Sequence, residues 1–154
     1  MILYLDSSAL VKRYVAEIGS QEVAQAMTQA QVSGTVVMAR AEMAAAFAKA
    51  VRMAALTEEE AKTCLDQFRR DWPHLVRTRV TEATVARADQ FAWQYHLRGY
   101  DAVHLAAAVL WQEILGELVT MATFDLKLWQ VATQVGILTY PADLPVQIKQ
   151  QKTI

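Results

Sequence analysis

Four acidic side chains stand out, because each lies where a predicted strand or helix begins or ends. They are Asp6, Glu42, Asp101 and Asp125. Gathering carboxylates in one place is unfavourable, since each negative charge raises the cost of ionising the next. At a separation of about 4 Å and an effective dielectric constant of about 20, two carboxylates repel by roughly 4 kcal/mol. If the four side chains meet in the folded chain, they therefore predict a bound cation.

Carboxylate oxygens suit a hard divalent cation such as Mg²⁺, with Mn²⁺ as the alternative. Such an ion activates water and stabilises the oxygens of a phosphodiester during an in-line displacement. Zinc is disfavoured, because Cys64 is the only cysteine and the three histidines are scattered along the sequence. Each acid also has a purely structural explanation. Asp6 and Asp125 could cap helices, while Glu42 and Asp101 suit the first turn of a helix.

The order of strands and helices indicates how the acids could meet. Apolar runs predict strands over residues 2–5, 35–38, 75–80, 118–122 and 137–140, with helices between them. This alternation favours an α/β fold with a mainly parallel central sheet flanked by helices. Ligands of such sheets bind beyond the carboxyl ends of the strands.

Three of the acids are expected at that edge of the sheet. Asp6 and Asp125 follow strands directly, and Glu42 lies one helical turn past another strand. Asp101 begins the most apolar helix, after a helix that Gly99 is expected to stop, so its place at the edge does not follow from the pattern. Prolines at positions 141 and 145 are expected to end regular structure.

The composition is that of one compact domain. The chain has 154 residues, of which 54% are hydrophobic and 20% charged. Its net charge of −1 provides no overall positive field for a nucleic acid, so a bound polyanion would need local basic groups or a metal. The single cysteine suits a reducing compartment, and the N-terminal apolar run is too short for a signal sequence. A cytoplasmic protein without a membrane segment is therefore expected.

Short motifs surround the four acids in a fixed order. Residues 3–14 read LYLDSSALVKRY, residues 40–42 read RAE, residues 100–108 read YDAVHLAAA, and residues 123–125 read TFD. In this order they resemble the motifs of PIN-domain proteins, and specifically the VapC type of toxin ribonuclease. The stretch around Asp101 is the most specific match. The resemblance runs from residue 2 to about residue 140.

This resemblance implies a single PIN-like domain over residues 1–142, followed by a polar C-terminal tail over residues 143–154. The catalytic, metal-binding acids would be Asp6, Glu42, Asp101 and Asp125. The polar neighbours that position a water molecule would be Ser7, Ser8 and Thr123. The implied activity is that of a Mg²⁺-dependent endoribonuclease, the toxin of a type II toxin–antitoxin system. Its partners would be RNA, a small antitoxin protein and a second copy of the chain.

Basic residues lie close to the acidic motifs. They are Lys12, Arg13, Arg40, Arg98 and Lys127. Lys12, Arg13 and Lys127 are candidates for contacts with RNA phosphates, and surface salt bridges are an equal alternative. His104 lies on an apolar helix, which favours a buried structural histidine bonded to backbone or to a carboxylate.

The sequence is compatible with two other functions. A phosphatase that forms an aspartyl-phosphate would use Asp6 as nucleophile, but such enzymes need a second acid where this chain has Ser8. A non-catalytic PIN-like module would bind RNA or protein without cutting, although the complete set of four acids argues against it. The apolar surplus of residues 44–55 also predicts an oligomer face or a partner groove.

Overall fold

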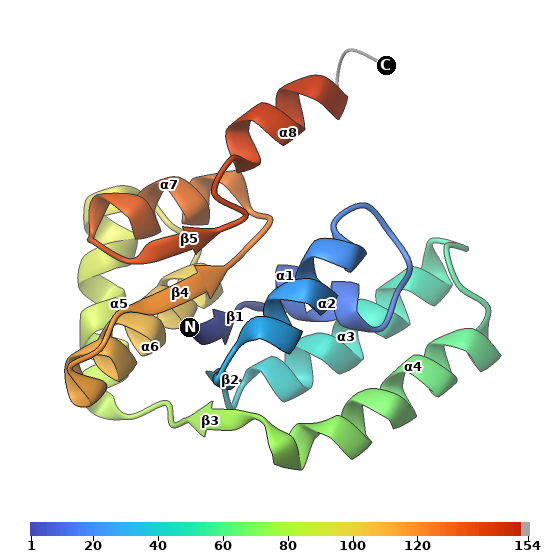
Figure 1. Ribbon diagram of the computed structural model, residues 1–154. Helices are drawn as coiled ribbons and strands as arrows, with labels where there is room; N and C mark the ends of the chain where they lie inside the picture. Colours follow the sequence, from blue (N-terminus) through green and yellow to red (C-terminus); the bar gives the residue numbers. More distant parts are fainter. Residues whose placement is uncertain (152–154) are drawn as a thin grey trace.

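The centre of the protein is a sheet of five parallel strands (Figure 1). A computed structural model describes residues 1–151. The strands are β1 (Ile2–Leu5), β2 (Val32–Val36), β3 (Val76–Thr78), β4 (Val119–Ala122) and β5 (Leu138–Tyr140). Their order across the sheet is β3-β2-β1-β4-β5, with β1 in the middle. The predicted parallel α/β fold is thus confirmed.

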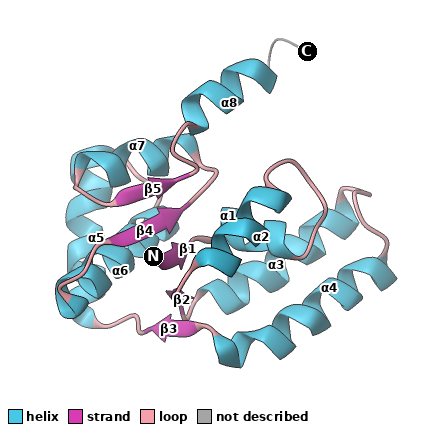
Figure 2. Cartoon of the chain, viewed as in Figure 1, coloured by secondary structure: helices cyan, strands magenta, loops and turns pink. Residues whose placement is uncertain are grey.

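Helices cover both faces of the sheet (Figure 2). They are α1 (Ser7–Leu10), α2 (Ser20–Gln29), α3 (Ala39–Arg52), α4 (Glu58–Asp71), α5 (Glu82–Tyr95), α6 (Gly99–Leu115), α7 (Leu126–Gln134) and α8 (Leu144–Gln151). Two short 3₁₀ turns, η1 (Val11–Arg13) and η2 (Trp72–His74), follow α1 and α4. Within the described residues, no helix is long and apolar enough to cross a membrane.

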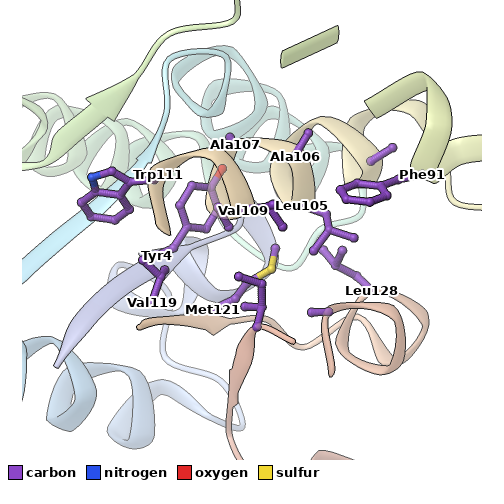
Figure 3. Packing of buried hydrophobic residues seen from close by; sticks show 14 of the residues in the cluster. Tyr4, Phe91, Leu105, Ala106, Ala107, Val109, Trp111, Val119, Met121 and Leu128 are labelled. Carbon is purple, nitrogen blue, oxygen red and sulfur yellow. The ribbon is translucent and has the colours of Figure 1, made fainter. Parts of the chain in front are cut away.

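Strand β1 separates two hydrophobic clusters, because its side chains alternate between the faces of the sheet. Ile2 and Tyr4 pack with residues of α5, α6 and α7, as Figure 3 shows for Tyr4 among its neighbours. Leu3 and Leu5 pack with residues of α1, α2, α3 and α4 on the opposite face. All four side chains are buried, which explains why the strand is a continuous apolar run.

Strand β2 lies earlier in the chain than predicted. The sequence predicts residues 35–38, whereas the strand spans Val32–Val36 and pairs Gly34 with Tyr4 of β1. Two ring atoms of Trp111 lie 2.8 and 3.0 Å from the position that a Cβ on Gly34 would occupy. Glycine in this strand therefore makes room for a core tryptophan, a tertiary requirement that local strand preference does not reveal.

The junction between α5 and α6 also differs from the prediction. His96, with a φ of 55°, ends α5 in the left-handed conformation expected of a C-terminal glycine. Gly99 is instead the first residue of α6, and Arg98 is its N-cap residue. This earlier start places Asp101 inside the first turn of α6.

The prediction that Pro145 ends regular structure is wrong, because it lies at the second position of α8. Proline is compatible with the first turn of a helix, where its missing N–H needs no partner. Leu144 is buried, and α8 extends beyond β5 and α7 in Figure 1. The predicted polar tail therefore contains a helix over residues 144–151, and residues 152–154 lie outside the described part of the chain.

Candidate active site

Four acids from four elements line one cavity. Asp6 caps α1 directly after β1, and Asp125 caps α7 shortly after β4. Glu42 and Asp101 lie in the first turns of α3 and α6. The cavity measures about 370 Å³, and the rest of its lining is Ser7, Ser8, Arg98, Tyr100, His104 and Phe124. As expected, Asp6, Glu42 and Asp125 lie at the same cavity. Asp101, whose position did not follow from the strand pattern, lies there too.

Asp6 is the most buried of the four acids, with 3% of its surface exposed. Its carboxylate accepts hydrogen bonds from the hydroxyls of Ser8 (2.8 Å) and Thr123 (2.7 Å) and from the Ala9 amide (2.9 Å). Burial nevertheless raises the pKa of Asp6, although the charge of His104 and these hydrogen bonds oppose the shift. The charged carboxylate is therefore unfavourable here unless a cation accompanies it.

Glu42 is held by a short chain of hydrogen bonds. His104 Nε2 lies 2.7 Å from Glu42 Oε2, which also accepts a bond from the Ser7 hydroxyl. His104 Nδ1 lies 3.0 Å from the hydroxyl of buried Tyr4. Partial burial opposes ionisation of Glu42, but the bonds from His104 and Ser7 and the charge of His104 outweigh it and lower its pKa. The prediction of a buried histidine bonded to a carboxylate is confirmed.

Arg98 connects the two remaining acids. Its Nε donates to Asp101 Oδ2 at 2.7 Å, and its Nη2 donates to Asp125 Oδ2 at 2.9 Å. The sequence marks Arg98 only as a basic residue near an acidic motif. The ion-pair bridge from Asp101 through Arg98 to Asp125 could not be predicted from the sequence, because Asp125 reaches Arg98 only when α7 packs beside α6.

Two hydroxyls join the loops that carry Asp6 and Asp125. Ser8 Oγ accepts a hydrogen bond from the Phe124 amide at 2.9 Å, and Thr123 Oγ1 accepts one from the Asp125 amide at 3.2 Å. The same two hydroxyls donate to Asp6. Ser8 and Thr123 therefore fix the two loops relative to each other and orient the Asp6 carboxylate.

The curated relatives of this chain are ribonucleases. It is 33% identical over 148 residues to Ribonuclease VapC45 of Mycobacterium tuberculosis, a match that covers 93% of this chain and 97% of the relative. It is 31% identical over 123 residues to Ribonuclease VapC3 of Pyrobaculum aerophilum, covering 79% and 89%. The chain belongs to the VapC family of PIN-domain ribonucleases. No family model matches it.

Solved structures share the fold of this VapC protein. FitAcB from Neisseria gonorrhoeae has a TM-score of 0.63 at 15% identity, covering 92% of this chain and 98% of that one. VapBC2 from Rickettsia felis, bound to a DNA fragment from their promoter, has a TM-score of 0.61 at 12% identity, covering 90% and 97%. At this level of identity, the likeness supports the architecture alone.

Membership of the VapC family implies a divalent metal cation, and the donor chemistry of the cavity fits one. The lining offers four carboxylates, the ligand type that hard cations prefer, and burial of Asp6 makes an accompanying cation favourable. Within residues 1–151, however, no three acidic, histidine or cysteine side chains are drawn together tightly enough to form a metal-binding group. Two of the acids turn toward Arg98 instead.

The predicted RNA-contact lysines and arginine lie outside the lining of this cavity. Lys12 Nζ pairs with Glu17 at 2.9 Å and lies 4.5 Å from the ring centroid of Phe124. Arg13 and Lys127 are exposed. For Lys12 the structure thus shows the salt bridge that the sequence left as an alternative, while contacts of the three residues with RNA stay a prediction.

The lowered pKa of Glu42 predicts a pH-dependent stability effect in the metal-free protein. The ionised form stabilises the fold, so this contribution is present above the unfolded pKa and is lost as pH falls through the lower folded pKa. We expect Glu42→Gln to be less stable than the wild type at about pH 7, with the difference disappearing below about pH 4. Urea unfolding in EDTA across this range measures it. Exposed Glu117→Gln is the control, and a difference that persists in acid would contradict the assignment.

Proposed function

We propose that this protein is a Mg²⁺-dependent endoribonuclease that hydrolyses RNA at the cavity of the four acids, within a nuclease domain of residues 1–142. We infer further that it is the toxin of a type II toxin–antitoxin system. The observation that carries the proposal is the convergence of four carboxylates on one cavity in a chain of the VapC family. A substrate phosphate would be repelled by these acids unless a cation neutralised them.

In the proposed reaction Asp6, Glu42, Asp101 and Asp125 hold the cation. When bound, Mg²⁺ or Mn²⁺ activates a water molecule and neutralises charge on the phosphate. Ser8 and Thr123 keep the Asp6 carboxylate oriented toward the cavity. The donors Ser7 and His104 keep Glu42 ionised and in place, since they lower its pKa.

The phosphatase alternative receives no support from the geometry. Such an enzyme needs a second acid two residues after the nucleophile, and this chain has Ser8 there. The Ser8 hydroxyl instead donates a hydrogen bond to the Asp6 carboxylate. The non-catalytic module stays the alternative that the experiment below must exclude.

We propose three partners: an RNA strand, a small antitoxin protein and a second copy of the chain. Large apolar side chains on the surface support a protein partner. Trp93 on α5 is 86% exposed and Ile114 on α6 is 81% exposed, and both offer apolar area that a bound protein would cover. On the opposite face of the sheet, Met53 at the end of α3 and several alanines are also exposed, in the region where the sequence predicts an interaction face.

The test of the proposed function is an assay of RNA cleavage by the purified protein with and without a divalent metal ion. We expect discrete products from total RNA in Mg²⁺ or Mn²⁺, none in EDTA, and recovery when excess Mg²⁺ is restored, because the carboxylates alone repel the substrate. Single-stranded DNA of matching sequence serves as the comparison substrate. RNA that stays intact under every condition, in the presence of a folded protein that binds it, would favour the non-catalytic module.

A further inference from the structure

Arg98 occupies an unusual place for an arginine, at the mouth of an acidic cavity. Its guanidinium makes one charge-assisted hydrogen bond to Asp101 and another to Asp125, so a single planar group joins α6 to α7. It is the only lysine or arginine in the lining formed by the described residues. The hydrogen bond and charge of Asp101, with the charges of Asp125 and Asp6, raise its pKa.

We propose that Arg98 is an internal counter-ion that holds Asp101 and Asp125 in the metal-free protein and is displaced from them by the divalent cation. This inference rests on the proposed function, because it takes the cavity to be the metal site. In this view Arg98 and the metal compete for the same two carboxylates. The metal affinity of the protein is then set partly by an arginine that is not itself a ligand.

The exposure of the three side chains supports such an exchange. The Arg98 side chain is 75% exposed, so it can leave the carboxylates without giving up buried apolar contacts. Asp101 and Asp125 are only 17% and 28% exposed, and they stay at the cavity when the arginine moves. Ion pairs made by exposed side chains are weak, and a doubly charged ion in the same place is the stronger partner.

The competition also explains why the acids do not form a tight metal-binding group in this structure. Asp101 Oδ2 and Asp125 Oδ2 both accept a hydrogen bond from the guanidinium, so each carboxylate gives one of its oxygens to Arg98. Release of Arg98 frees one oxygen of each aspartate for the cavity. Asp6 and Glu42 are fixed by hydroxyl and histidine donors and need no such release.

The first measurement is the Kd of Mn²⁺ by calorimetry, without RNA, for the wild type and for Arg98→Gln. We expect the variant to bind Mn²⁺ roughly two- to tenfold more tightly, the gain available from two exposed ion pairs. Arg98→Lys keeps the charge but lacks the planar fork of donors that bonds both carboxylates here, so we expect its Kd to fall between the other two. Arg87→Gln is the matched control, because Arg87 pairs with Glu113 away from the cavity.

A second measurement follows the arginine itself. The Nε–H resonance of Arg98, assigned by its loss in Arg98→Gln, is expected to shift during a Mg²⁺ titration of the wild type.

An unchanged or weaker Mn²⁺ affinity in Arg98→Gln, with normal binding by the wild type, would overturn the inference and leave the proposed function intact. Absence of metal binding by the wild type would overturn the proposed function as well.

Discussion

Replacement of Asp6 by asparagine is expected to lower RNA cleavage by at least about 100-fold while leaving the metal-free protein folded. Loss of a group that only supports a metal ligand costs about 10- to 100-fold, so loss of a direct ligand should cost at least as much. Asparagine has nearly the same shape and is itself a good N-cap for α1, which Asp6 caps through the Ala9 amide. The change therefore removes the charge and replaces one acceptor oxygen by an amide NH₂, toward which the hydroxyls of Ser8 and Thr123 must turn an oxygen lone pair.

Asp6→Asn should also make the metal-free protein more stable at neutral pH. Burial raises the pKa of Asp6 above its unfolded value, so the ionised side chain opposes folding at any pH above the folded pKa. That penalty disappears as pH falls below the unfolded pKa of about 4, and the advantage of asparagine disappears with it. A higher melting temperature in EDTA at about pH 7, but not at about pH 3, is the expected result.

The matched control is Asp89→Asn, an exposed aspartate on α5 that does not line the cavity. It should change neither cleavage in Mg²⁺ nor the melting temperature in EDTA. Near-normal cleavage by Asp6→Asn would remove Asp6 from the proposed metal site. A melting temperature below that of the wild type at about pH 7 but not at about pH 3 would show that the Asp6 charge stabilises the fold, contrary to the direction of its pKa.

Much of this architecture was predictable, because buried parallel strands carry a strong local signal. The apolar run of residues 2–5 ends at Asp6, and a strand buried on both faces can occupy only the interior of a sheet. Once the strands are placed in parallel, their carboxyl ends share one edge, and Asp6 and Asp125 must lie there. Asp101 was identified only by the motif around it, since its position depends on the packing of α6.

The features that were not predicted depend on contacts between distant residues, or on local sequences that are compatible with more than one structure. The bounds of β2 depend on a tryptophan from α6 that covers Gly34, and the strand preference of Ser33 and Gly34 is low. Helix α8 begins with a proline in its first turn, a pattern that suits both a helix start and a chain break. The Arg98 bridge unites residues from two helices, and only one of its partners is near it in sequence.

Replacement of Phe68 by alanine is expected to destabilise the protein by about 3–5 kcal/mol, the range found for deletion of a buried aromatic ring. Phe68 is fully buried on the face of the sheet covered by α1 to α4. Its ring packs edge-on against Tyr14, with ring centroids 5.6 Å apart, and against Trp72, with centroids 5.4 Å apart. Alanine would remove both contacts and leave a cavity that the surrounding structure fills only in part.

Loss of the Phe68 ring would also loosen the support of the candidate site. Phe68 belongs to α4, which packs against α3, and α3 carries Glu42. Urea unfolding in EDTA measures the change in the free energy of unfolding, and Ile18→Ala, at a position 68% exposed, is the control with an expected change below about 0.5 kcal/mol. RNA cleavage by Phe68→Ala at low temperature should persist, since Phe68 does not line the cavity, and should fail at the lowered unfolding temperature. A loss below about 1 kcal/mol would mean that Tyr14 and Trp72 close over the missing ring.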